Sequence, residues 1–227
     1  MKLNKLLFLL LSSILYSHFT FTQSANLHSQ EVEILKQIGE KLGLDRNKGW
    51  DFDKDPCTGQ GKWGASVSCD CSFDRNTTCR VTQIYITSEN VSAALPSEFA
   101  KLQNLKSLDL NRNYFHGTIP SEWVTMRLNF LILMGNRLSG PFPTTLTRMT
   151  TLQVLIIDGN QFSGSIPKEI ANLRNLEKLS LSSNDFNGRL PIALAKLSNL
   201  TDVMISDNNF TGKIPNFISH WTKIVTL

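Results

Sequence analysis

A motif of about 24 residues recurs five times between positions 108 and 215, and this repetition constrains the fold more than any other feature of the sequence. The repeated segments read LDLNRNYFHGTIP, LILMGNRLSGPFP, LIIDGNQFSGSIP, LSLSSNDFNGRLP and VMISDNNFTGKIP. Their shared asparagines are 23, 24, 24 and 24 residues apart, at Asn113, Asn136, Asn160, Asn184 and Asn208. A fixed period of this length predicts a solenoid, in which each repeat is one coil that packs on its neighbours.

A leader such as LQNLKS or LRNLEK precedes the repeated segment and extends the pattern to L-x-x-L-x-x-L-x-L-x-x-N-x-L/F-x-G-x-I-P. This pattern resembles the plant extracellular class of leucine-rich repeat, and the resemblance covers residues 81–227. It implies an α/β repeat fold, a solenoid with one parallel β-sheet on its concave face.

Each coil is expected to begin with a short strand. Leu108 and Leu110 are two positions apart and should point together into the core, while Asp109 points to the concave face. The resemblance implies that Asn113 and its four equivalents form a buried ladder, in which each amide bonds backbone groups of the turn and of the adjacent repeat. Such a ladder would satisfy polar groups that a tight bend otherwise leaves unpaired.

The segment before the repeats is expected to cap the first coil. Residues 30–42, QEVEILKQIGEKL, carry apolar residues at helical spacing and are followed by Gly43, so they predict a helix. Residues 81–96 fit the repeat frame, although Glu89 stands at the asparagine position and Ala93 at the glycine position, which predicts a degenerate first coil. We therefore assign residues 25–80 to an N-terminal cap, which resembles that of plant leucine-rich repeat proteins, and residues 81–227 to the repeats, the last of them incomplete.

Four cysteines lie within this cap, at Cys57, Cys69, Cys71 and Cys79. In a secreted chain such a cluster predicts disulfides rather than a zinc site, and four cysteines allow three connectivities. We favour Cys57 with Cys69 and Cys71 with Cys79, because a ring closed by Cys69 and Cys71 would be strained. The sequence alone leaves the connectivity open.

Residues 1–24 have the features of a secretory signal peptide, with two lysines before an apolar run from Leu6 to Tyr16 and small residues near a cleavage site. Their removal takes away two lysines and no acidic residue, so the 23 basic residues become 21 against 19 acidic ones. This balance argues against binding to nucleic acid or to an anionic membrane. No later segment is apolar for long enough to predict a transmembrane helix, so we expect the chain to be secreted or to lie on the extracellular face of the plasma membrane.

Four Asn-x-Ser/Thr sequons are candidate glycosylation sites in a secreted protein, at Asn76, Asn90, Asn199 and Asn209.

No combination of residues predicts catalysis, a bound cofactor or a metal. Asp51, Asp53 and Asp55 alternate like the start of an EF-hand loop, but Pro56 and Lys62 stand where that loop needs glycine and glutamate. The histidines lie in unrelated contexts without a ligand or nucleophile motif. The sequence therefore predicts a binding protein rather than an enzyme.

Binding is expected on the concave face, where several non-consensus positions are apolar. These positions form an apolar group with a charged rim, and the candidate contact residues are Asp109, Arg112, Phe130, Ile132, Met134, Val154, Ile156, Asp158 and Lys178. An apolar patch with such a rim is typical of a protein or peptide contact. The alternative, which involves no binding partner, is that apolar residues simply suit a β-surface, or that a glycan or neighbouring domain covers them.

The cap motif DFDKDPC, the run VSCDCSFDRNTTC and the closing NFTGKIPNFISHWTKIVTL together resemble the ectodomain of plant leucine-rich repeat receptor-like kinases, particularly the subfamily with a malectin-like domain after the repeats. The resemblance implies recognition of an extracellular peptide, carbohydrate or protein ligand, pairing with a co-receptor, and a Ser/Thr kinase in a longer product. Kinase motifs are absent from these residues. The alternatives are a secreted inhibitor of microbial cell-wall-degrading enzymes and a soluble decoy or partner of a full-length receptor.

The last residues, WTKIVTL, match the leader and first strand of a further repeat. We expect that the sequence is truncated within the repeats, or that a partner covers the open coil.

Overall fold

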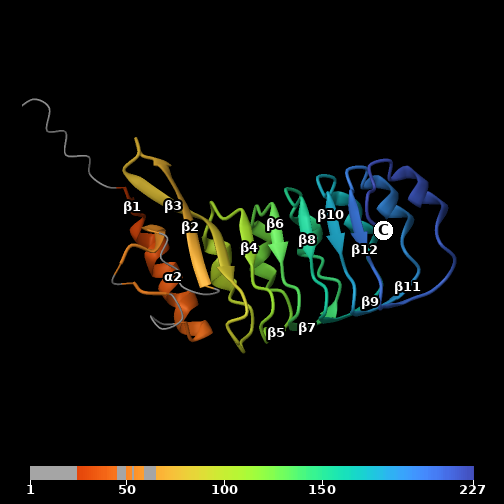
Figure 1. The fold of residues 1–227 in the computed structure, drawn as a ribbon, viewed down its shortest axis with the longest axis horizontal. Coiled ribbons are helices and arrows are strands. Elements are labelled where there is room, and N and C mark those ends of the chain that lie inside the picture. The colour runs from red at the N-terminus through yellow and green to blue at the C-terminus, as the bar shows by residue number, and fades with distance from the viewer. Residues whose placement is uncertain (1–24, 45–49, 53, 59–64) are drawn as a thin grey trace, which may run out of the picture.

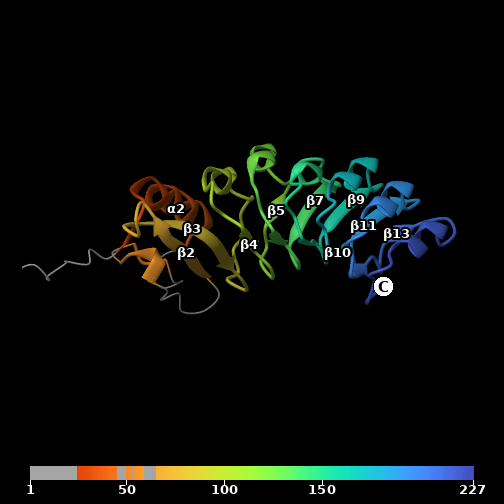
Figure 2. The same ribbon diagram turned by 90° about the horizontal axis from the view of Figure 1, so that it is seen from above.

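A computed structural model describes residues 25–44, 50–52, 54–58 and 65–227 of the chain. The predicted signal peptide at residues 1–24 lies outside the described residues. The described part is a solenoid of stacked coils with a cap at its N-terminal end (Figure 1). Figure 2 shows the same coils from above, with the short helices of successive coils along one side.

The main sheet has eight strands, and most of its strands come one from each coil. Its order is β1-β3-β4-β6-β8-β10-β12, with β2 paired to β3. The bounds of these strands are β1 Asn26–Leu27, β2 Ala65–Phe73, β3 Thr78–Ile86, β4 Ser107–Asp109, β6 Phe130–Ile132, β8 Val154–Ile156, β10 Lys178–Ser180 and β12 Asp202–Met204. All its pairs are parallel except the hairpin of β2 and β3. The predicted leucine-rich repeat solenoid with a parallel sheet is therefore confirmed.

A second parallel sheet of five strands was not predicted from the sequence. It runs in the order β13-β11-β9-β7-β5. Its strands are β5 His116–Gly117, β7 Arg137–Pro141, β9 Gln161–Gly164, β11 Asp185–Gly188 and β13 Asn209–Phe210. These strands cover the segment between the ladder asparagine and the repeat glycine, which adopts a positive φ, for example +74° at Gly164. Glycine permits this turn without the steric cost that a Cβ atom would bring.

Each coil returns through a short 3-10 helix, and most of these helices start directly after a proline. These helices are η3 Ser97–Lys101, η4 Ser121–Thr125, η5 Leu146–Arg148, η6 Lys168–Asn172, η7 Ile192–Lys196 and η8 Asn216–His220. Proline is the residue before the helix in five of them, where its fixed φ suits the turn and its missing N–H costs nothing.

The core lies between the main sheet and these helices and runs the whole length of the solenoid. The strand leucines, such as Leu108 and Leu110, are completely buried. Phe115, Leu138, Phe162 and Phe186 form the apolar spine behind the ladder and are also completely buried. The rings of Phe162 and Phe186 stack with centroids 6.2 Å apart, and the next pair, Phe186 and Phe210, repeats this arrangement at 6.4 Å. The repeat therefore carries one continuous core from coil to coil.

The cap consists of α2 Ser29–Leu42, the β2–β3 hairpin and the short helix η2 Pro56–Thr58. The predicted helix is present, and it ends at Gly43, which has the left-handed φ of +62°. Its buried residues include Leu35 and Ile38, which cover the apolar end of the first coil. A salt bridge of 2.7 Å joins Lys41 to Glu98 in η3 and holds the helix against the repeats.

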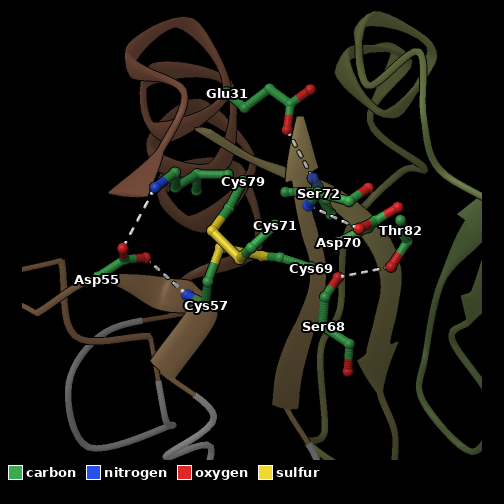
Figure 3. The surroundings of a disulfide bond; sticks show 12 residues. Glu31, Asp55, Cys57, Ser68, Cys69, Asp70, Cys71, Ser72, Cys79 and Thr82 are labelled. Carbon is green, nitrogen blue, oxygen red and sulfur yellow. Dashed lines mark hydrogen bonds between the residues drawn. A yellow bond between two sulfur atoms is a disulfide. The ribbon is translucent and has the colours of Figure 1, made fainter. Parts of the chain in front are cut away.

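Two disulfides link the cap, and Figure 3 shows them close together next to α2. Cys57 pairs with Cys69 and ties η2 to β2, while Cys71 pairs with Cys79 across the hairpin. This is the pairing that the sequence analysis favoured. The carboxylate of Asp55 accepts hydrogen bonds from the backbone N–H groups of Leu27, at 3.2 Å, and Cys57, at 2.8 Å (Figure 3).

Candidate binding surface

The ladder asparagines set the distance and register between coils. Asn160 is buried, and its Nδ2 donates to the carbonyl oxygens of Leu133 at 2.9 Å, Ile157 at 3.0 Å and Asp158 at 3.2 Å. Its Oδ1 accepts a hydrogen bond of 3.0 Å from the backbone N–H of Leu138 in the preceding coil. The other four asparagines repeat these contacts.

This register aligns the concave side chains into three rows across the main sheet. The first row follows the strand partners Gln83, Ser107, Phe130, Val154, Lys178 and Asp202. The second row follows Tyr85, Asp109, Ile132, Ile156, Ser180 and Met204. The third row, two positions further along each coil, contains Asn111, Met134, Asp158, Ser182 and Ser206. Neighbours in a row lie one strand spacing apart, about 4.8 Å.

The five apolar residues that the sequence analysis selected lie together in these rows, and we call them the concave patch: Phe130, Ile132, Met134, Val154 and Ile156. Phe130 and Val154 are direct strand partners, as are Ile132 and Ile156. Phe130 is 41% exposed and the other four are partly buried. The patch is therefore an apolar surface in contact with solvent at the middle of the concave face.

Two of the predicted rim residues are engaged within the protein. Asp109 is only 9% exposed, and its Oδ1 accepts hydrogen bonds from the backbone N–H and the side-chain Nδ2 of Asn111. Burial raises the pKa of Asp109 above its ordinary value, although the bonds from Asn111 act in the opposite direction. Asp158 accepts hydrogen bonds from the hydroxyl of Ser180 and the backbone N–H of Ser182 in the next coil. These two carboxylates stabilise their own surroundings and offer little free surface to a partner.

The two basic rim residues, Arg112 and Lys178, have different surroundings. Arg112 is exposed and lies in the turn after β4, where its φ is +54° and its backbone N–H donates to the carbonyl of Met134. Lys178 lies in the first row beside Asp202. Hydrogen bonds from the hydroxyls of Thr201 and Thr226 lower the pKa of Asp202, and the charge of Lys178 adds to this effect. Arg112 and Lys178 therefore each place a basic side chain at the rim of the patch, and that of Lys178 lies beside the carboxylate of Asp202.

Gln83 and Tyr85 belong to the same face but were missed in the sequence analysis. They lie on β3, whose parallel pairing with β4 places Tyr85 beside Asp109. The hydroxyl of Tyr85 donates to Oε1 of Gln83 at 2.9 Å. The alternation of these two residues with Ile84 and Ile86 was the available signal, because alternate residues of a strand face opposite sides.

None of the four sequon asparagines lies in the three rows. Asn76, Asn90 and Asn209 are exposed. Asn199 is partly buried, with its Nδ2 donating to the carbonyl of Arg174 at 2.9 Å and its Oδ1 accepting from Lys223 at 2.8 Å. Glycosylation at these positions stays a prediction.

Within the described residues, no group of three or more His, Cys, Asp or Glu side chains could hold a metal ion. Asp53 of the EF-hand-like segment lies outside those residues. In the same part of the chain, no helix is long and apolar enough to cross a membrane.

Models of known protein families match the repeats. A model described as leucine rich repeat matches residues 126–186, and a second one with the same description matches residues 104–126 and 199–221. A probable LRR receptor-like serine/threonine-protein kinase of Arabidopsis thaliana is 50% identical over 155 residues, which are 63% of this chain and 15% of the kinase. The chain thus spans about 15% of the length of this curated relative, and no catalytic domain lies in the matched part.

Solved ectodomains share the fold. The Arabidopsis receptor kinase HAESA, in complex with the peptide hormone IDA and the co-receptor SERK1, has a TM-score of 0.77 and 27% identity over 88% of this chain and 33% of the solved chain. The LRR ectodomain of the Arabidopsis receptor kinase SOBIR1 has a TM-score of 0.69 and 26% identity over 84% of this chain and 100% of the solved chain.

Proposed function

This chain is a leucine-rich repeat protein related to plant LRR receptor-like kinases, and we propose that it is the extracellular recognition part of such a receptor, binding a protein or peptide partner on its concave face. The contact would use the concave patch with Arg112 and Lys178 at its rim. Asp109 and Asp158 would stabilise the surrounding concave surface through their internal hydrogen bonds rather than contact the partner.

The observation that carries this proposal is the concave patch. A soluble protein normally covers a sheet face or lines it with polar residues, whereas here five apolar side chains adjoin one another on the neighbouring strands β6 and β8 and on the segment just after β6. Exposed apolar residues that occur singly need no explanation, but a contiguous group with a charged rim is typical of an interaction site. Phe130 would serve as the anchor, because aromatic residues dominate binding energy at interfaces.

The comparisons support the receptor assignment. The relatives are receptor-like kinases, and HAESA was solved with a peptide hormone and a co-receptor. These ligands belong to HAESA, and their chemistry is a guide to the class of partner for this chain. A kinase domain in a longer product, and a malectin-like domain after the repeats, stay predictions from the sequence motifs.

The test is binding by a variant that carries Phe130→Asp and Ile156→Asp. Two probes suit it: a displayed library of random linear peptides selected on the wild-type protein, and the SERK1 ectodomain as a candidate co-receptor. We expect the double variant to lose at least tenfold in affinity for probes selected by the wild type, because two desolvated anchors become charged. The melting temperature should change little, since Phe130 and Ile156 face solvent rather than the core.

A matched control carries Gln83→Asp and Ser206→Asp, which place two negative charges on the same concave face outside the patch. This control should keep the wild-type affinity. Equal loss in both variants would indicate a general charge effect, and undiminished binding by the Phe130→Asp/Ile156→Asp variant would contradict the proposed contact.

A further inference from the structure

The cap contains a polar cavity that is separate from the concave patch. It has a volume of about 310 Å³ and lies where the start of α2, the β2–β3 hairpin and the segment after η3 meet. Neither the disulfides of the cap nor the repeat pattern explains why a polar cavity is present at this place. Its walls include Phe73 and Arg80 from the hairpin, and Lys101, Gln103 and Asn104 from the first coil.

Arg80 is the central charge of this cavity. Its side chain is 26% exposed, and its partner among the residues that the structure describes is Glu31, with 3.6 Å between Nη1 and Oε1. That distance is too long for a hydrogen bond, so the donors of the guanidinium are open to a ligand. Glu31 is 4% exposed, and its Oε2 already accepts a hydrogen bond of 2.7 Å from the backbone N–H of Val81.

The balance of charge favours an anion despite the buried carboxylate. Lys101 adds a second positive charge, and its Nζ makes a long contact of 3.4 Å with Gln37. The first turn of α2, a helix of 14 residues, contributes the partial positive charge of a helix N-terminus. An arginine fork, with a lysine in the wall of the same cavity, is suited to a carboxylate, which the arginine can hold through two parallel hydrogen bonds.

The other walls suit the ring of a sugar. The side-chain amides of Gln30, Gln103 and Asn104 have no protein partner among the described residues, so they can donate to and accept from hydroxyl groups. Phe73 is partly exposed at the wall and offers an apolar face. A volume of about 310 Å³ is at the lower end for ligand sites, which fits one sugar ring rather than a long chain.

We propose that this cavity binds a hexuronate, a sugar that carries a carboxylate, either free or as one residue of an acidic oligosaccharide. Arg80 and Lys101 hold the carboxylate, the three amides hold the hydroxyls, and Phe73 packs against the ring. This site is distinct from the concave patch, so its ligand and the partner of the patch can bind independently.

The experiment measures binding of defined sugars to the purified protein by titration calorimetry and saturation-transfer NMR. The probes are D-galacturonate, its linear trimer, D-glucuronate, neutral D-galactose and acetate. We expect both hexuronates to bind. Galactose and acetate should bind at least tenfold more weakly, because galactose lacks the carboxylate and acetate lacks the sugar ring with its hydroxyl groups. The trimer distinguishes a chain residue from a free sugar, because a site for free sugars alone would exclude it.

Arg80→Gln should weaken hexuronate binding by about tenfold or more, because it removes charged hydrogen bonds. Lys101→Gln should also weaken it, and this exposed position does not endanger folding if Arg80→Gln does. The matched control is Arg75→Gln, a cation in the turn of the same hairpin that does not line the cavity, and it should leave affinity unchanged.

Absence of binding by wild type at millimolar hexuronate would overturn the proposal, as would equal affinity for galactose or for acetate. A loss in Arg75→Gln equal to that in Lys101→Gln would also overturn it, because general charge would then explain the effect. The Phe130→Asp/Ile156→Asp variant should retain hexuronate binding, which separates failure of this proposal from failure of the proposed function.

Discussion

At the scale of single residues, the same repeat position can be structural or available for contact, and burial decides which. The side-chain amides of Asn160 and its equivalents form hydrogen bonds with backbone groups of two coils. Asp109 and Asp158 lie on the concave face yet are occupied by Asn111, Ser180 and Ser182. Phe130 has no such role and stays exposed, so it is the residue that a partner can reach.

Replacement of Asn160 by alanine should destabilise the protein by about 1–3 kcal/mol, because the buried N–H of Leu138 loses its side-chain acceptor and three carbonyl groups each lose one of their donors. Urea unfolding measures this change. Asn187→Ala, at an exposed position of β11, should have little effect and serves as the control. An unchanged unfolding midpoint for Asn160→Ala would show that the ladder does not stabilise the solenoid.

Asp109→Asn should stabilise the protein at neutral pH. Because burial raises the folded-state pKa of Asp109 above its ordinary value of 3.8, the ionised form costs folding free energy. That cost is absent below about pH 3.8 and grows as the pH rises through the folded-state pKa. Asparagine can still accept the bonds from Asn111. Thermal melts from pH 3 to pH 7 should therefore show a gain for the variant that increases with pH, and a gain that is independent of pH would refute this account.

At the scale of elements, the cap is held by contacts that each occur once, whereas the repeats use the same set of contacts in successive coils. Disulfides tie η2 and the hairpin together, and the buried carboxylate of Glu31 joins α2 to β3. The salt bridge between Lys41 and Glu98 joins α2 to η3. These connections close the N-terminal end of the core, which the first coil would otherwise expose.

Removal of the Cys57–Cys69 disulfide by the double change Cys57→Ala and Cys69→Ala should destabilise the protein by about 2–3 kcal/mol. The main reason is that the unfolded chain gains conformational entropy when the cross-link is absent. Hydrogen exchange should locate the loss of protection in α2 and β2, because contacts in a solenoid reach only neighbouring units. Equal loss of protection in β10 would instead indicate that the cap and the repeats unfold as one unit.

At the scale of the whole molecule, stacking of similar coils produces a long concave surface. The side chains on this surface can differ from coil to coil independently of the core. The main sheet keeps its leucines inside, so the concave side chains can change without cost to the core. The concave patch and the cavity in the cap lie in different parts of the solenoid. The molecule therefore offers two separate surfaces, and the two proposed experiments examine them with different probes.

The sequence by itself determined the solenoid and the cap helix, because these depend on spacing within one repeat and between adjacent repeats. The ladder followed from the resemblance of these repeats to plant leucine-rich repeats. Leu108, Asn113 and Gly117 recur with their period, and the period is sufficient to place them. The five residues of the concave patch were likewise found from their positions in the repeat.

Only the tertiary structure decided what depends on contact between coils or between the cap and the first coil. It showed the second sheet, the burial of Asp109, the bonds of Asp158 to the next coil and the place of Tyr85 beside Asp109. It also brought Arg80 and Lys101 to one cavity, although they are 21 positions apart in the sequence. The physical reason is that burial and hydrogen bonding across coils follow from register in space, which the composition of a single repeat does not specify.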